Sequence, residues 1–210
     1  MTDLRGLACS EAYLFLVYTR GACPPPANPL SLASQGKRLD VAARIIAAAY
    51  GTGVLRPPEA VFIYVDDWPK RTCMVRITRE DLNLEGANVY EIHAATILIR
   101  LLRSGRERVV HDIGFRDAVN VIAESYKAAP VVLAENGKDI TMFLREKPKR
   151  VLYILGGAVD PPRDSIRGLP AYSIGPRSYL ASHVVAFIVL LHNIKYLEEQ
   201  ILDAHDRDDG

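Results

Sequence analysis

The run of residues 151–155, Val-Leu-Tyr-Ile-Leu, constrains the fold of this chain more than any other segment. A strand with one face in water alternates apolar and polar residues, whereas this run is hydrophobic throughout. Such strands are typical of parallel sheets that are covered on both faces. Gly156 and Gly157 follow directly and end the run. We therefore expect a central parallel strand with helices packed on either side of it.

Shorter apolar runs and helix-forming segments alternate along the rest of the chain. Strands are expected at residues 14–18, 61–65, 73–77, 131–133 and 171–174. Helices are expected at residues 39–50, 92–103, 116–127 and 178–203. Residues 66–71 form a turn that joins the second and third of these strands in a hairpin. The alternation predicts an open α/β sheet with a mostly parallel core.

The bulk composition predicts a folded protein of one domain, spanning residues 1–210. Hydrophobic residues make up 49% of the chain and charged residues 24%, which is ordinary for a globular protein. The formal net charge of +1 neither favours nor excludes a nucleic-acid partner, which needs only a local basic face. Cys9, Cys23 and Cys73 lack metal-ligand spacing, so we expect neither a zinc site nor a disulfide scaffold.

No segment predicts export or insertion into a membrane. The apolar run at residues 12–18 lacks the basic region and cleavage signature of a secretory signal. The apolar stretch at residues 184–191 is too short to cross a bilayer. We therefore expect a cytoplasmic protein without a membrane partner.

Three turns of small residues follow three of the predicted strands, at residues 135–137, 156–158 and 175–177. Open α/β sheets bind ligands at the carboxyl ends of their strands, and glycine lets a ligand approach the main chain. Residues 156–157 lack the spacing of a dinucleotide fingerprint, and no phosphate-binding GxxxxGK[ST], GxSxG or HExxH motif occurs. The sequence therefore predicts a ligand site at this edge without naming the ligand.

Several polar residues allow both a functional and a structural interpretation. Asp40 and Arg44 lie four residues apart on one predicted helix face, where a solvated surface pair is the default expectation. His183 lies on an apolar helix and is expected to be a packed, hydrogen-bonded core residue rather than a catalyst. The proline-rich segment 24–29 is either a stiff connector or a flexible substrate loop. Four arginines either bind phosphates or neutralise a helix end: Arg100, Arg103, Arg106 and Arg108.

Four groups of residues occur in the order that is found in a known family. They are Gly36-Lys37-Arg38-Leu39-Asp40 with Arg44, residues 113–117 with residues 133–140, residues 153–156, and residues 173–176 with residues 180–183. This ordered set resembles the archaeal tRNA pseudouridine(54) N1-methyltransferases of the SPOUT superfamily. The chain would then be a divergent member of that family.

The resemblance implies a SPOUT-type, mostly parallel sheet with helices on both faces and a C-terminal trefoil knot. The knot and the cofactor region would occupy residues 130–203, approximately. It further implies that the methyl donor S-adenosyl-L-methionine is the cofactor, that the protein is a homodimer, and that RNA, namely tRNA, is the partner, with no DNA.

The resemblance also assigns roles to individual residues. Asp40 and Arg44 match the family's polar pair beside the target base and would be catalytic, while no residue is assigned to a metal. A pseudouridine N1-H must lose its proton as the methyl group moves, and a carboxylate can accept that proton. The residues that would bind the cofactor are Leu133, Leu155, Gly156, Gly157, Ser173, Ile174, Gly175, Tyr179, Leu180 and Val184.

The chain departs from the family pattern beside the expected cofactor site. Val184 stands where the family has a cysteine, and residues 157–162 replace an Asp-His-x-Gly motif. The expected activity is N1-methylation of pseudouridine in the T-loop of tRNA. The alternatives are N1-methylation of pseudouridine in ribosomal RNA, and a non-catalytic RNA-binding dimeric scaffold that has lost the donor site.

Overall fold

The computed structural model describes residues 12–51, 54–82, 89–104, 108–146 and 148–208. Cys9 and Arg106, which entered the sequence predictions, lie outside the described residues. The same holds for the side chains at position 195 and at positions 198–208, near the end of the last helix.

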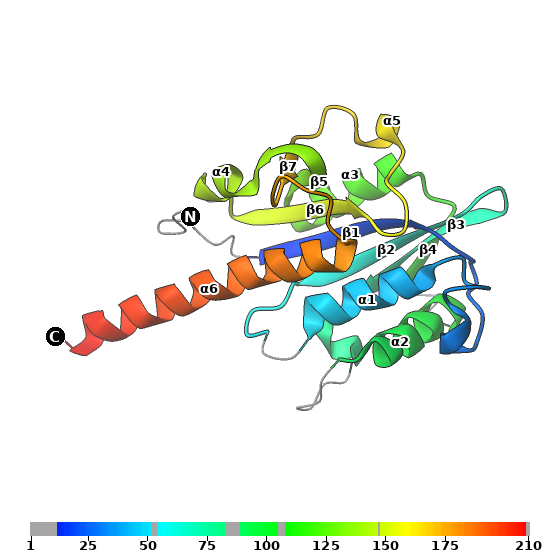
Figure 1. The fold of residues 1–210 in the computed structure, drawn as a ribbon, viewed down its shortest axis with the longest axis horizontal. Coiled ribbons are helices and arrows are strands. Elements are labelled where there is room, and N and C mark those ends of the chain that lie inside the picture. The colour runs from blue at the N-terminus through cyan, green and yellow to red at the C-terminus, as the bar shows by residue number, and fades with distance from the viewer. Residues whose placement is uncertain (1–11, 52–53, 83–88, 105–107, 147, 209–210) are drawn as a thin grey trace.

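In the described part of the chain, seven strands form one mixed sheet, six of which the sequence predicted (Figure 1). Their order across the sheet is β4-β3-β2-β1-β6-β5-β7. The parallel strands are β1 (Ala12–Arg20), β2 (Ala60–Asp67), β5 (Ala129–Asp139), β6 (Arg150–Gly156) and β7 (Ala171–Ser173). The antiparallel strands at one edge are β3 (Arg71–Ile77) and β4 (Val109–His111). The mostly parallel sheet and the β2–β3 hairpin are therefore confirmed.

The central strands are buried on both faces. Along β1, Tyr13, Phe15 and Val17 belong to one hydrophobic core, and the alternate residues belong to the other. Residues 151–155 of β6 alternate in the same way and are at most 3% exposed. Successive side chains of a strand point to opposite faces, so the uninterrupted apolar run of β6 fills both cores.

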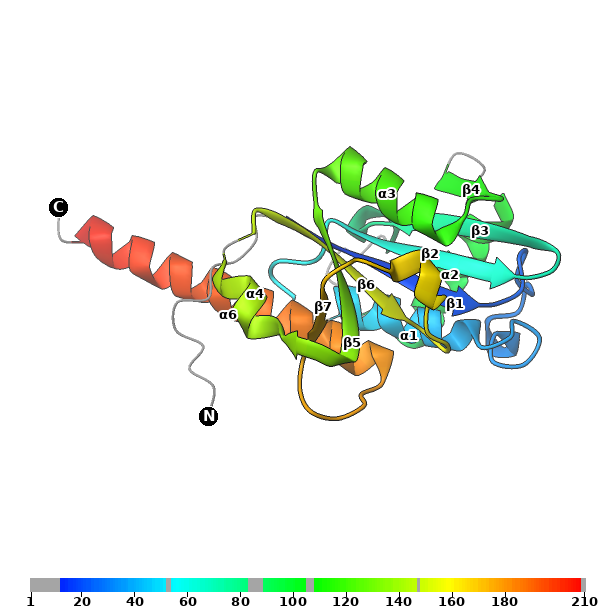
Figure 2. The ribbon, with the colours of Figure 1, turned by 90° about the horizontal axis from the view of Figure 1, so that it is seen from above.

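Helices cover both faces of the sheet (Figures 1 and 2). The first core is closed by α1 (Leu39–Tyr50), α2 (Glu91–Ser104), α4 (Ile140–Arg145) and α6 (Ala181–Asp208). The second core is closed by α3 (Phe115–Tyr126), with α5 (Arg163–Ile166) beside it. The short 3-10 helices span Pro29–Ser31 and Arg79–Leu82. The far half of α6 extends beyond the rest of the molecule (Figure 1).

The four long helices were predicted, whereas one short strand and two short helices were missed. Helix α1 has the predicted bounds and ends at Gly51. The strand β4 and the helices α4 and α5 have 3, 6 and 4 residues, which is too short for a periodic pattern to show. Among the described residues, no helix is both long and apolar enough to cross a membrane.

Cys23 and Cys73 form a disulfide, which corrects the expectation that the cysteines would not pair. Both residues are buried, and 50 positions separate them in the sequence. The backbone N–H of Cys23 donates to Asp67 Oδ2 at 3.1 Å. The bond thus joins the loop after β1 to β3. A lone pair at this separation has no spacing signature, so only the fold reveals it.

The described arginines at and after the end of α2 contact the chain itself. Arg103 Nη1 donates to the carbonyl of Pro25 at 2.9 Å, Arg100 Nη2 donates to the Asp81 carbonyl at 3.3 Å, and Arg108 pairs with the Asp81 carboxylate. These contacts favour the structural interpretation of the arginines. They also favour the connector interpretation of residues 24–29, because Arg103 ties that segment to α2.

The histidines of α6 differ from the prediction. His183 is exposed rather than packed in the core. Of the two histidines of α6 whose side chains are described, His192 is buried: its ring stacks on Tyr13 with centroids 3.8 Å apart, and its Nε2 lies 3.1 Å from the Tyr153 hydroxyl. Burial, followed by the charge of Arg56, lowers the pKa of His192 to about 3. His183 was misassigned because the apolar face of a long helix cannot be located to within one residue from sequence.

Candidate functional site

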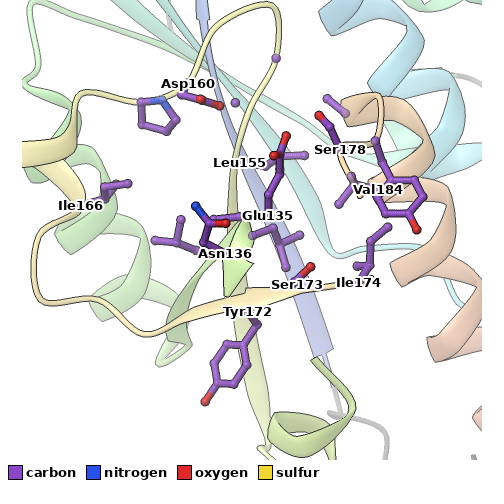
Figure 3. Close-up of a pocket in the computed structure, with 18 of the residues that line it drawn as sticks. Glu135, Asn136, Leu155, Asp160, Ile166, Tyr172, Ser173, Ile174, Ser178 and Val184 are labelled. Carbon is purple, nitrogen blue, oxygen red and sulfur yellow. The ribbon is translucent and has the colours of Figure 1, made fainter. Parts of the chain in front are cut away.

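A cavity of about 510 Å³ opens where the carboxyl ends of β5, β6 and β7 meet (Figure 3). Its size lies within the range of small-molecule sites. In Figure 3, Asp160 and Asn136 lie on one side of the space, Ser178 and Val184 lie on the other, and Leu155 and Ser173 lie between them. The position agrees with the rule that parallel sheets bind ligands beyond the carboxyl ends of their strands.

An irregularity in β5 forms one wall of the cavity. Both Leu133 and Lys138 pair with Tyr172 of β7, so residues 134–137 bulge out between them. Glu135 and Asn136 lie in this bulge and line the cavity. A side chain at position 137 would overlap the backbone of Tyr172, which explains why glycine stands there. The turn 135–137 noted in the sequence is therefore a bulge inside a strand.

The loop after β6 forms the second wall. The backbone N–H of Gly157 donates to the carbonyl of Tyr18 at 2.7 Å, which fixes the loop to β1. A Cβ on Gly156 would lie 2.6 Å from the Val159 carbonyl and 2.9 Å from the Cα of Asp160. The loop therefore folds back over Gly156 and brings Asp160 into the lining of the cavity.

The segment between β7 and α6 forms the third wall. The Ser173 hydroxyl accepts from the N–H of Gly175 at 3.2 Å and donates to the Gly175 carbonyl at 2.5 Å. The Leu180 carbonyl accepts from the N–H groups of His183 and Val184 and so starts α6. This local bonding places Ile174, Tyr179 and Val184 on the cavity.

The cavity combines an aliphatic lining with polar side chains that have no partner in the described part of the chain. Leu133, Leu155, Ile174 and Val184 supply the aliphatic surface. The polar side chains without a hydrogen bond or an ion pair to described residues include Glu135, Asn136, Asp160, Arg163, Arg177 and Ser178. Both charge signs are represented, so the cavity offers carboxylates to a cation and guanidinium groups to a carboxylate.

Eight of the ten residues predicted to bind a cofactor line this cavity. They are Leu133, Leu155, Gly156, Gly157, Ser173, Ile174, Tyr179 and Val184. Gly175 lies behind the lining, where a Cβ would meet the Tyr179 hydroxyl at 2.7 Å, and Leu180 is 62% exposed. Their contact with a cofactor stays a prediction. The sequence missed Asp160 and Arg163 because nothing in their neighbourhood indicated that the chain turns back to the sheet.

The predicted catalytic pair lies elsewhere, at the start of α1. Arg44 Nη2 lies 2.8 Å from Asp40 Oδ2, and Arg38 Nε lies 3.0 Å from Asp40 Oδ1. Burial acts to raise the pKa of Asp40, but the hydrogen bond and charge of Arg38, followed by the charge of Arg44, hold that pKa below its usual value. Asp40 is therefore an ionised carboxylate at neutral pH.

Asp40 lines a second cavity, of about 310 Å³, between α1, the start of α2 and the 3-10 helix Pro29–Ser31. Its other lining residues are Pro29, Leu30, Leu32, Ala33, Ala43, Glu91, Ile92 and Ala95. The two cavities share no lining residue. Within one chain, the structure therefore does not bring the predicted catalytic pair together with the predicted cofactor residues.

Comparison with known proteins gives one relative in sequence and a matching fold. No protein-family model matches the chain. The tRNA (pseudouridine(54)-N(1))-methyltransferase of Pyrococcus abyssi (strain GE5 / Orsay) is 25% identical over 171 residues, which cover 72% of this chain and 82% of that protein. The solved structure of Archaeoglobus fulgidus Nep1 bound to S-adenosylhomocysteine has the same fold, with a TM-score of 0.54 and 14% identity over 90% of this chain and 99% of that one.

A ribosomal RNA small subunit methyltransferase E from Neisseria gonorrhoeae, bound to S-adenosyl methionine, matches with a TM-score of 0.46 and 13% identity over 87% of this chain and 65% of its own. That likeness is too distant to support an argument. The sequence relative agrees with the order of motifs along the chain and supports its resemblance to a divergent member of the archaeal tRNA pseudouridine(54) N1-methyltransferase family, and the solved structure shows the same fold.

Proposed function

We propose that the chain is an S-adenosylmethionine-dependent RNA methyltransferase that methylates N1 of pseudouridine in the T-loop of tRNA. The observation that carries the proposal is the cavity at the ends of β5, β6 and β7, where several polar side chains, including Glu135, Asn136 and Asp160, have no partner in the described chain. The activity named for the Pyrococcus abyssi relative supplies the reaction and the RNA. A tRNA-modifying enzyme would act in the cytoplasm.

The residues of the cavity fit S-adenosylmethionine, which supplies a methyl group on a positively charged sulfur. Leu133, Leu155 and Ile174 offer an aliphatic surface for a flat adenine. The carboxylates of Glu135 and Asp160 suit ribose hydroxyls, an ammonium group or the sulfonium charge. Arg163 and Arg177 suit the carboxylate of the methionine part. The backbone near Gly156 and Gly157 would lie against the donor, since glycine leaves room for close approach.

Asp40 would accept or orient the proton that leaves the pseudouridine N1, and Arg44 would hold a phosphate or the base edge. The lowered pKa of Asp40 supports the first role, because the carboxylate is ionised at the pH of the reaction. Arg44 Nε is buried and has no hydrogen-bond partner among the described residues; its nearest carboxylate oxygen in an ion pair, Glu91 Oε1, lies 3.9 Å away. A buried donor of this kind is costly to leave unpaired, which supports a ligand near it.

The two cavities lie apart within one chain, and a homodimer would bring the second cavity of one copy near the donor cavity of the other. Phe187, Leu190, Ile194 and Leu197 follow one another on α6 at intervals of three and four residues, which is the spacing of a helix-packing stripe. Leu190 is 53% exposed and Leu197 is 46% exposed. A second copy that covers this stripe would bury apolar surface and could bring its α1 toward the donor cavity. Measurement of the mass in solution by light scattering tests the dimer, and a monomer under reaction conditions contradicts it.

The C-terminal part of the chain, residues 130–203, would form the trefoil knot that the resemblance to the family implies. The support is the path of the chain. After the edge strand β7, residues 174–180 pass the cavity, and α6 then packs Val185 and Ile188 into the core that α1 closes. The segment between β7 and α6 would then be the loop of the knot that holds the donor.

Calorimetric titration with S-adenosylmethionine is the first test of the function. Saturable binding is expected, and the absence of binding at millimolar donor would leave the RNA-binding scaffold as the better interpretation. Nucleoside analysis of tRNA and ribosomal RNA from a deletion strain is the second test. Loss of N1-methylpseudouridine from tRNA supports the proposal, whereas loss from ribosomal RNA alone would assign the enzyme to that substrate.

A further inference from the structure

The tip of the β2–β3 hairpin exposes the one tryptophan of the chain. Trp68 follows β2 directly, and its side chain is 80% exposed. Single exposed hydrophobic residues are common and need no explanation by themselves. Trp68 differs in three respects. Hydrogen bonds hold the turn that presents it, cations flank it, and it lies at the same end of the parallel strands as the large cavity.

Hydrogen bonds fix the turn. The N–H of Trp68 donates to Asp66 Oδ1 at 3.0 Å, and the N–H of Lys70 donates to the Asp67 carbonyl at 2.8 Å. Asp66 is itself held by the Tyr18 hydroxyl, which donates to its Oδ2 at 2.6 Å. The fixed turn presents the indole from a defined backbone position before any ligand arrives, which reduces the entropy lost on binding.

The charge around the tip favours a negatively charged partner. Lys70 and Arg71 are both exposed, and neither forms an ion pair with a described residue. Of the two carboxylates beside the turn, Asp67 is buried and pairs with Lys37 at 2.7 Å, and Asp66 is partly buried and accepts from the Tyr18 hydroxyl and the Trp68 N–H. Asp112, beside Thr72 at the base of the hairpin, is the nearby acidic residue that is exposed. The cations at the tip are thus free to contact phosphates.

The tip lies at the same end of the parallel strands as the donor cavity. In the register of the parallel strands, Asp66 of β2 is opposite Arg20 of β1, and Gly156 of β6 is opposite Tyr18. The hairpin and the loop after β6 are therefore separated by two strand spacings, roughly 10 Å. Figure 1 shows the hairpin continuing past the end of β1 on this side of the molecule. An RNA strand of a few nucleotides can span that separation.

We propose that Trp68 is a stacking platform for an unpaired base of the RNA substrate, with Lys70 and Arg71 contacting the adjoining phosphates. The inference rests on the proposed function and adds to it a surface that recognises unpaired nucleotides beside the reacting one. Aromatic side chains next to cations are the general means of holding single-stranded RNA, because every base has a face that can stack. Proteins recognise RNA mainly at loops and bulges, where bases are unstacked.

The test uses the emission of Trp68, which reports on its own environment without a label. The donor-saturated protein is titrated with a fluorescein-labelled RNA hairpin that has an unpaired loop, and anisotropy and tryptophan emission are recorded in matched titrations. Quenching that saturates together with the anisotropy supports the platform, and a fully paired duplex should quench less. RNA binding without a change in emission overturns the platform but leaves the proposed function intact. Failure of the RNA to bind overturns both.

Two substitutions separate stacking from charge. Trp68→Ala should weaken binding of the hairpin RNA by about tenfold or more, and Trp68→Phe should restore most of it. Arg71→Ala should reduce the slope of log affinity against log salt by about 0.7, the value for one phosphate contact on a single strand. Lys149 is exposed and lies just before β6, at the opposite end of the strands. Lys149→Ala is therefore the control and should change neither the affinity nor the salt slope. Emission that changes with protein concentration alone would instead assign Trp68 to a contact between copies of the chain and overturn the platform.

Discussion

At the ends of β5, β6 and β7, the polar side chains of Glu135, Asn136 and Asp160 have no partner among the described residues, whereas at the start of α1 the carboxylate of Asp40 is held by two arginines. The donor cavity and the Asp40 ion cluster therefore differ in what they would gain from a ligand. The cavity groups gain hydrogen bonds when a ligand binds. Asp40 would have to give up or share a partner to act on a substrate, and a surface ion cluster needs no substrate at all.

The largest expected effect separates these two interpretations of Asp40. Asp40→Ala should reduce turnover roughly 10²- to 10⁴-fold, because a positioned base contributes about that much. Donor affinity should stay unchanged, because Asp40 does not line the donor cavity. Single-turnover kinetics and calorimetry measure the two quantities. Unchanged turnover would assign Asp40 to the surface ion cluster.

The second effect tests the donor cavity through two neighbouring glycines. Gly156→Ala should weaken donor binding roughly ten- to a hundredfold, because the new Cβ meets the Val159 carbonyl at 2.6 Å and pushes the loop aside. Gly157→Ala is the matched control: its Cβ comes no closer than 3.3 Å to Thr19 and Tyr18, so we expect a loss of about threefold or less. Calorimetry measures both, and equal affinities would show that the donor binds elsewhere.

A smaller effect is expected at the polar side chains of the cavity. Asp160→Asn should weaken donor binding by about five- to tenfold, since a neutral amide replaces a charge-assisted hydrogen bond. Asp164→Asn provides the control, because that carboxylate is exposed, pairs with Arg167 and does not line the cavity. A loss of the same size in both variants would point to long-range charge rather than to contact with the donor.

The smallest effect concerns stability. Asp40→Asn should lower the free energy of unfolding by about 1 kcal/mol or less at neutral pH, as partly exposed ion pairs contribute little. The pKa of Asp40 is lowered in the folded state, so its contribution is complete above the ordinary carboxyl pKa and is lost as the pH falls through the lowered value. Urea unfolding of both proteins from neutral to acidic pH measures this. A difference that persists in acid would mean that the charge of Asp40 is not its source.

Much of the scaffold could be predicted because its signals are local. The apolar run 151–155 predicted a strand buried on both faces, and helix α1 was placed from its own residues with Gly51 at its end. The bond between Cys23 and Cys73 and the core position of His192 could not be predicted in this way. Each depends on a partner that is distant in the sequence, and spacing contains no information about such partners.

The candidate site was predicted in part for the same reason. Gly156 marks where β6 ends, and residues 135–137 mark where β5 leaves its regular pairing, so Leu133 and Gly156 could be placed close together. Asp160, Arg163 and Ser178 enter the cavity because their loops fold back across that edge, which no local pattern indicated. The ordered motifs of the family supplied Asp40 and Arg44, but not their distance from the donor cavity.

The hydrophobic pattern of the sequence by itself determined the four long helices, six of the strands and the covering of the sheet on both faces, because burial of a strand or a helix face requires apolar residues at fixed intervals. Only the tertiary structure decided which side chains meet. It paired Cys23 with Cys73, separated Asp40 from the donor cavity, and placed Trp68 on the cavity's edge of the sheet. Strand order and register set these contacts, and they follow from the packing of the whole chain rather than from any one segment of it.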